Sequence, residues 1–236
     1  MAQARSRHIG TATNVREFLN SVLEKPSQPD DVWVFRGQTD ARWAPAPHID
    51  RAALQQFRDG AQWSRLRHER WLLDEFKKGA RQHTPVPPQD EWEWLALAQH
   101  HGLATRLLDW TSNPLGALYF ACEHPGTDDS VVWCYHHLGE QAQPGSDPFG
   151  IAGIAAYWPP HVTQRITVQG GCFTAHPEAG RDETIDWPGD LLQVLVPGDA
   201  RARMRHELTQ LGITRATLFP DLDGIAFALN KRVSAE

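Results

Sequence analysis

Residues 99–114 read QHHGLATRLLDWTSNP, and they carry the strongest structural signals in the chain. Apolar residues recur at helical spacing before this run. Because glycine accepts the left-handed conformation at a helix C-terminus, we expect that helix to end at Gly102. Leu107-Leu108 is typical of a short buried strand. Asn113-Pro114 is typical of a helix start, where asparagine accepts bonds from first-turn N–H groups and proline lacks only an unneeded N–H.

Three residues, Asp109, Trp110 and Thr111, therefore lie between a strand end and a helix N-terminus. We expect backbone N–H groups and the positive end of the helix dipole to point there, which suits an anion such as a phosphate. Asp109 and Thr111 are then placed to bond a sugar or a base. The alternative interpretation is an ordinary loop in which Arg106 and Asp109 form a structural ion pair.

A second motif follows a short apolar strand predicted at Val32–Phe35 and reads RGQTD over residues 36–40. We expect it to be a polar turn. Gly37 allows close approach to the backbone at a strand end. Arg36 offers a planar set of donors to phosphate or carboxylate. The alternative is that Arg36 pairs with Asp40 at the surface.

The rest of the chain predicts helices in the first half and short strands in the second. Expected helices cover 15–22, 50–82 with a break near Gly60, 202–211 and 225–232, and expected strands cover 130–135, 165–174 with a glycine bulge, and 191–196. The charges of the second helix favour a solvated face. The order is not a regular β-α-β alternation. It predicts an α+β domain with a helical N-terminal half packed on a mixed or antiparallel sheet.

Composition sets limits on the class of protein. The chain has 236 residues, of which 41% are hydrophobic, so a sizeable core and a single domain over 1–236 are expected. The net charge of −6 argues against a broad basic face for nucleic acid. Three cysteines without C-x-x-C spacing indicate a reduced, cytoplasmic protein. No apolar run approaches the roughly 20 residues of a membrane span, so no membrane is expected.

Histidines and tryptophans offer weaker signals. The tandem His136-His137 has no acid or cysteine at a motif-like spacing, so we interpret both as loop histidines and expect no metal. Ten tryptophans are many for this length, and Trp33, Trp43 and Trp110 stand beside polar motif residues, where they are candidates to line a pocket.

Together these motifs resemble the FRG domain family, which is named for its Phe-Arg-Gly motif. The resemblance is carried by Phe35-Arg36-Gly37, by His101 to Thr111, and by Pro114 with Ala117 to Ala121. Two later runs, 165–174 and 218–224, resemble other typical segments of the family, so the resemblance covers roughly residues 30 to 230.

The motif order is in turn similar to that of the ADP-ribosyltransferase superfamily, and this resemblance implies that fold and an NAD substrate. It implies that Arg36, with Gly37 and Gln38, meets the NAD diphosphate or ribose. Asp109 would stabilise the sugar cation or accept a proton, and Gln169 would orient the acceptor or a ribose hydroxyl. The remaining implied NAD contacts are Thr111 on ribose or carboxamide, and Trp110 or Phe120 stacked on nicotinamide.

The superfamily's third motif usually carries a catalytic glutamate, and no acid stands in the matching run, Gln169 to Thr174. The leading hypothesis is nevertheless an NAD-dependent transferase. Its acceptor would be a protein, DNA or RNA, and its context a toxin or phage-defence system with an antitoxin or defence partner. The second hypothesis is a non-catalytic module that senses NAD. The third is a hydrolase that uses Asp109 with His100 or His101.

Overall fold

The computed structural model describes residues 6–28, 30–51, 63–124, 126–160, 170–178 and 186–233. Seven strands in these residues form one mixed sheet in the order β1-β7-β4-β2-β3-β6-β5, in which only the β1–β7 pair is parallel. The strands are β1 (Arg7–Thr11), β2 (Trp33–Gln38), β3 (Leu107–Thr111), β4 (Ser130–His137), β5 (Ala155–Tyr157), β6 (Gly171–Ala175) and β7 (Gly189–Val196). Helices and a sheet together confirm the α+β class.

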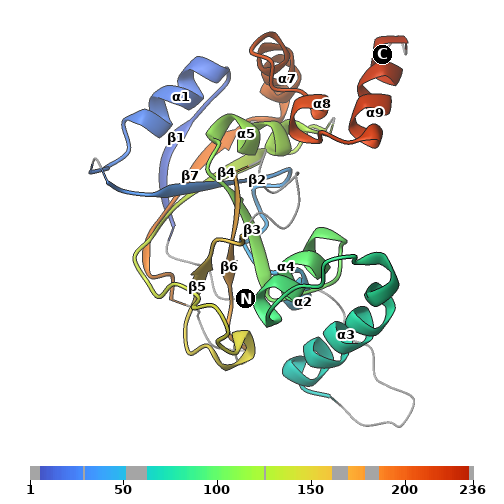
Figure 1. Ribbon diagram of the computed structural model, residues 1–236. Helices are drawn as coiled ribbons and strands as arrows, with labels where there is room; N and C mark the ends of the chain where they lie inside the picture. The colour runs from blue at the N-terminus through green and yellow to red at the C-terminus, as the bar shows by residue number, and fades with distance from the viewer. Residues whose placement is uncertain are drawn as a thin grey trace.

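The helices flank this sheet (Figure 1). They are α1 (Val15–Leu23), α2 (His48–Arg51), α3 (Arg65–Ala80), α4 (Glu91–His100), α5 (Pro114–Cys122), α7 (Arg201–Gln210), α8 (Arg215–Leu218) and α9 (Leu222–Val233), with 3₁₀ turns η1 (Arg81–His83), η2 (Pro148–Gly150) and η3 (Gly198–Ala200). The helices expected around 15–22, 202–211 and 225–232 are confirmed. So are the strands expected at 130–135 and 191–196, each a little longer than predicted.

The sheet divides between β2 and β3. These neighbours share a single residue pair, Phe35 with Thr111, whereas β2 pairs with β4 over six residues and β3 with β6 over five. In Figure 1 the strands β7, β4 and β2 run across the direction of β3 and β6. The two halves therefore separate on the Trp110 and Asp109 side of this pair, and Arg36 to Gln38 lie at that opening.

Each half of the sheet has its own helical cover. Helices α1, α5 and α7 pack on β2, β4 and β7 around Phe18, Phe35 and Met204. Helices α3 and α4 pack on β3 and β6 around Leu73 and Trp92. A third buried cluster, which includes Val34, Trp110, Tyr135 and Cys172, joins the two halves on the opposite side of β2. Since successive side chains of a strand alternate between faces, Arg36 points away from α5.

Local sequence signals explain the ends of the helices. Asn14 and Asn113 cap α1 and α5 with their side chains, as expected. Helix α4 ends where predicted: Gly102 has φ +86°, its N–H donates to Gln99 O, and Leu103 N–H donates to Ala98 O. This pair of bonds is a Schellman cap, which turns the chain back toward β3.

The first half of the chain is rich in helix, as predicted, although β1, β2 and β3 also lie within it and β1 pairs with β7 far along the chain. Three expectations are wrong. The RGQ segment is not a turn: Arg36 to Gln38 continue β2 and pair with β4. His136 and His137 belong to β4 rather than to a loop. The charged face of α3 is not all solvated, since Glu69 is buried.

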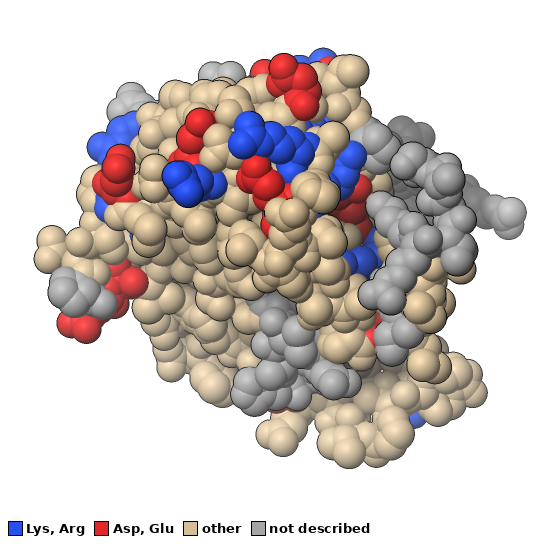
Figure 2. Space-filling view, turned by 90° about the horizontal axis from the view of Figure 1, so that it is seen from above, with Lys and Arg blue, Asp and Glu red and all other residues tan. Residues whose placement is uncertain are grey.

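Two predicted segments lie partly outside the described residues, namely 52–62 of the long helix and 165–169 of the glycine-bulge strand pair. None of the described helices is both long and apolar enough to span a bilayer. On the face seen in Figure 2, the described Lys and Arg side chains lie among Asp and Glu and form no face-wide patch of one sign. Arg203 and Glu207 of α7, for example, form an ion pair at 2.8 Å.

Candidate functional site

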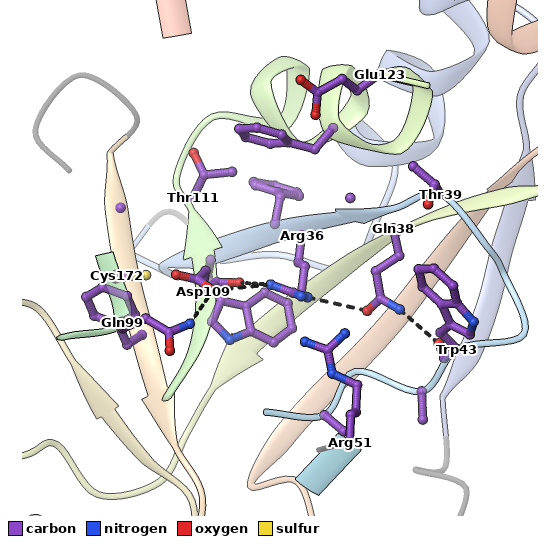
Figure 3. Close-up of a pocket in the computed structure, with 18 of the residues that line it drawn as sticks. Arg36, Gln38, Thr39, Trp43, Arg51, Gln99, Asp109, Thr111, Glu123 and Cys172 are labelled. Carbon is purple, nitrogen blue, oxygen red and sulfur yellow. Dashed lines mark hydrogen bonds and ion pairs between the residues drawn. The ribbon is translucent and has the colours of Figure 1, made fainter. Parts of the chain in front are cut away.

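The opening between β2 and β3 forms a cleft of about 460 Å³, within the range of about 300–1,000 Å³ typical of ligand sites. It extends from the C-terminal end of α5 to the end of α2 (Figure 3). Residues of both motifs line it: Phe35, Arg36, Gly37, Gln38, Thr39, Trp43, Ala44, Ala46, Arg51, Gln99, His100, Asp109, Trp110, Thr111, Phe120, Glu123, His124, Gly171, Cys172 and Phe173.

Arg36 spans the opening. Its Nη1 donates to the Asp109 carbonyl oxygen at 2.9 Å and lies 3.8 Å from Asp109 Oδ2. The guanidinium thus contacts β3 just where the strand ladder stops. Burial lowers the pKa of Arg36 below its usual value, the charge of Asp109 opposes this change, and the charge of Arg51 adds to it. An arginine still keeps its charge near neutral pH, so a cation stays fixed in the cleft.

A second arginine faces the first. Arg51 ends α2, and its guanidinium points toward Arg36 and Gln38 (Figure 3). It has no hydrogen bond or ion pair to any residue that the structure describes. Gln38 accepts from Arg36 Nε at 3.4 Å and donates from Nε2 to the Trp43 carbonyl oxygen at 3.0 Å. Gln38 therefore orients both the first arginine and the loop that carries Trp43.

Asp109 supplies the negative charge of the cleft, and its side chain is 55% exposed. Gln99 Nε2 donates to Asp109 Oδ2 at 2.8 Å, and Thr105 Oγ1 donates to Gln99 Oε1 at 2.7 Å. Gln99 of α4 and Arg36 therefore both approach the Oδ2 oxygen of this carboxylate (Figure 3).

The N-terminus of α5 is not available to an anion, contrary to our expectation. Asn113 Oδ1 accepts from Leu115 N and Gly116 N, and the Asn113 carbonyl accepts from Ala117 N. Asn113 N in turn donates to Thr111 Oγ1 at 3.0 Å. Because these first-turn N–H groups are already bonded, attraction for an anion falls to Arg36 and Arg51.

Gly37 serves the fold rather than a ligand. A Cβ at this position would lie 1.9 Å from Ala117 O and 2.5 Å from Ala121 N. Gly37 does permit a close approach, as expected, but the group that approaches is the backbone of helix α5. The expectation that a ligand approaches the backbone here is wrong.

The aromatic residues divide into buried and accessible ones. Trp110 is only 3% exposed, packs against Tyr135 and Trp187, and donates from Nε1 to Thr174 Oγ1. It is a fixed wall of the cleft. Trp43 is half exposed at the cleft, and Phe120 lines its α5 side. Trp33 does not line the cleft; it stacks on His136 in the core.

Neither simple ion-pair alternative from the sequence is correct. Arg106 is fully buried and bonds Glu69 Oε2 at 2.5 Å, so it does not pair with Asp109. Asp40 accepts a hydrogen bond from Arg42 at 2.6 Å, and this contact lowers the pKa of Asp40 to about 2. Asp40 therefore does not pair with Arg36, whose guanidinium lies in the cleft.

Other candidate groups lie at or near the cleft. His100 lines it, whereas His101 does not and packs near Phe76. Burial raises the pKa of the Cys172 thiol to about 12, so this cysteine is not a thiolate nucleophile at neutral pH. Glu123 accepts from Arg215 Nη1 at 2.6 Å. No group of three His, Cys, Asp or Glu side chains suited to a metal occurs within the described ranges.

The structure thus brings Arg36, Gln38, Asp109, Thr111 and Phe120 together, and Gln169 lies outside the described residues. The sequence patterns did not indicate Arg51, Gln99 or Glu123 as lining residues. Gln99 is the one with a sequence signal, because it lies one helical turn before the predicted end of α4.

The family profile of the FRG domain matches residues 31–130. This stretch holds the first two motif groups and stops before the runs at 165–174 and 218–224. No curated protein and no solved structure matches the chain. The matched stretch contains β2, α4, β3 and α5, and with them Arg36 and Asp109. Residues 31–130 are therefore similar to the FRG domain.

Proposed function

We propose that this protein is an ADP-ribosyltransferase that uses NAD to modify a macromolecular acceptor. The observation that carries the proposal is the position of Arg36. This arginine lies in the opening of a divided sheet, faces a second arginine, and contacts the strand that bears a half-exposed carboxylate. A cationic pair beside a carboxylate suits a ligand with a diphosphate next to a reacting sugar.

The cleft offers partners for each part of NAD. Arg36 and Arg51 bind the diphosphate, and Gln38 keeps Arg36 in place through the bond to Nε. Trp43 and Phe120 supply aromatic surface for the two rings. Arg51 supports this fit because no carboxylate of the described residues forms an ion pair with it. Thr111 contacts the ribose.

The transfer requires one bond to break and one to form. The glycosidic bond between the nicotinamide nitrogen and ribose C1′ breaks, and its electron pair leaves with neutral nicotinamide. A nucleophilic atom of the acceptor then bonds C1′, and its proton passes to the Asp109 carboxylate. Asp109 also stabilises the developing positive charge of the sugar, so positioning and electrostatics supply most of the rate.

The acceptor is a protein or a nucleic acid, and we propose a toxin or phage-defence role with a cognate antitoxin or defence partner. The mixed charges in Figure 2 favour a compact acceptor site over an extended nucleic-acid track on that face. A single protruding nucleotide or side chain suffices for the reaction.

The test is nicotinamide release from NAD by the purified protein, alone and with cell lysate. Arg36→Ala and Arg51→Ala should each weaken NAD binding in calorimetry, and Arg36→Ala should abolish release without unfolding the chain. Arg203→Ala is the matched control, since this exposed arginine forms its ion pair with Glu207 on α7, outside the cleft. Isotope-labelled NAD then identifies the acceptor.

The outcomes separate the hypotheses. Release that depends on Arg36 supports a transferase. NAD binding without release under any condition supports the sensing module instead. Neither binding nor release overturns the proposal, and cleavage of another substrate that needs Asp109 and His100 but no NAD supports the hydrolase.

A further inference from the structure

Asp109 is an exposed residue of β3, and the protein contacts only one of its two carboxylate oxygens among the described residues. Gln99 Nε2 donates to Oδ2 at 2.8 Å, and Arg36 Nη1 lies 3.8 Å from the same oxygen. Oδ1 has no partner among the residues that the structure describes. The two oxygens of one carboxylate are therefore in different environments, one fixed by the protein and one left for a substrate.

The orientation of the Gln99 amide is set by a third residue. A glutamine amide presents either its oxygen or its NH₂ group to a neighbour, because the two ends are similar in shape. Thr105 Oγ1 accepts from Leu107 N at 3.1 Å and donates to Gln99 Oε1 at 2.7 Å. Since the hydroxyl proton goes to Oε1, the NH₂ group must face Asp109.

The four groups thus form one directed chain of hydrogen bonds. It runs from the Leu107 N–H to the Thr105 hydroxyl, from this hydroxyl to Gln99 Oε1, and from Gln99 Nε2 to Asp109 Oδ2. The Schellman cap at Gly102 makes the chain possible, because it folds residues 103–109 back beside the last turn of α4. Every donor in the chain has a matching acceptor.

We propose that Gln99 is a positioning residue for Asp109, oriented by Thr105, and that it holds Oδ2 so that Oδ1 is the oxygen that meets the reacting sugar and receives the acceptor's proton. The catalytic half of this inference rests on the proposed function. A displacement of about 1 Å at a reacting group can cost about 100-fold in rate. Loss of the Gln99 contact should therefore lower kcat with little effect on KM.

The first experiment needs no activity. Side-chain amide signals are recorded in ¹H–¹⁵N correlation spectra, and the Gln99 signal is identified by its loss in Gln99→Leu. We expect Asp109→Ala and Thr105→Val to shift this signal, and Thr105→Ser, which keeps the hydroxyl, to leave it in place. A Gln99 signal that Asp109→Ala does not move overturns the contact.

The second experiment measures nicotinamide release by the same variants. We expect Gln99→Leu to lower kcat by 10-fold to 100-fold with KM within about threefold, consistent with a misplaced reacting group. Thr105→Val should show a smaller loss, and Thr105→Ser should restore it. Gln99→Glu keeps the size and the acceptor for Thr105 but replaces the donor by a second carboxylate, so it should be no better than Gln99→Leu.

A merely structural tie between α4 and β3 predicts a different pattern. Gln99→Leu would then lower the melting temperature and leave kcat of the folded fraction unchanged, which overturns the positioning role. Equal loss in Thr105→Ser and Thr105→Val also overturns it. If the wild type releases no nicotinamide, the proposed function and the catalytic half of the inference fail, whereas the amide spectrum still decides the contact itself.

Discussion

His176 is a buried neutral histidine behind the cleft wall, and it should make the stability of the fold depend on pH. His176 is 2% exposed, and its Nε2 lies 2.9 Å from Thr174 Oγ1. Thr174 Oγ1 already accepts from Trp110 Nε1, so the threonine proton goes to the histidine. This arrangement needs an unprotonated Nε2.

The magnitude follows from the pKa. Burial, with smaller contributions from the charges of Arg65, Arg36 and Arg106, lowers the pKa of His176 to about 3. In the unfolded chain a histidine has a pKa of about 6.5. As the pH falls below about 6.5, the unfolded state binds a proton that the native state does not, so the free energy of unfolding decreases until the pH reaches about 3.

The slope is about 1.4 kcal/mol per pH unit. The interval from the unfolded pKa to pH 4 is about 2.5 units, so this one group should remove about 3.4 kcal/mol of stability between pH 7 and pH 4. For a chain of this length that loss corresponds to a melting temperature lower by about 7–14 °C.

The assay compares the wild type with His176→Gln, which keeps an acceptor for Thr174 but does not titrate. Urea unfolding is followed at pH 7 and pH 4, and other titrating groups cancel in the difference. We expect the advantage of the wild type over the variant to shrink by about 3 kcal/mol at pH 4. Parallel pH profiles of wild type and His176→Gln would refute the reasoning.

Two further predictions concern packing. Gly37→Ala should lower the free energy of unfolding by about 3 kcal/mol, because the new methyl group meets backbone atoms of α5 that no rotamer change can move. As a control, Gly79→Ala places its methyl group in open space on α3 and should raise the melting temperature slightly. Glu69→Gln should cost about 3–5 kcal/mol in urea unfolding, because it leaves the buried guanidinium of Arg106 uncompensated. Glu75→Gln, which breaks an exposed pair, should change little, and equal losses in the two glutamate variants would contradict the role of burial.

Local signals were enough to place the elements around the cleft. The end of α4 at Gly102, the strand β3 and the cap of α5 by Asn113 each depend on backbone chemistry within a few residues, so the sequence alone determined them. The same holds for Arg36 and Asp109 as candidate site residues, since each charged side chain stands at the end of an apolar run in a motif.

Tertiary structure decided what those residues contact. Strand β1 has little apolar pattern of its own and exists through its pairing with β7, about 180 residues away. Arg106 lies just before β3 and its guanidinium bonds Glu69 in the core, whereas Asp109 lies within β3 and is exposed at the cleft. Arg51 reached the cleft only because α2 packs there. Ion pairs and pockets depend on distances between segments that are remote in the sequence. Those distances are set when the two helical layers pack on the sheet, and no local sequence pattern encodes them.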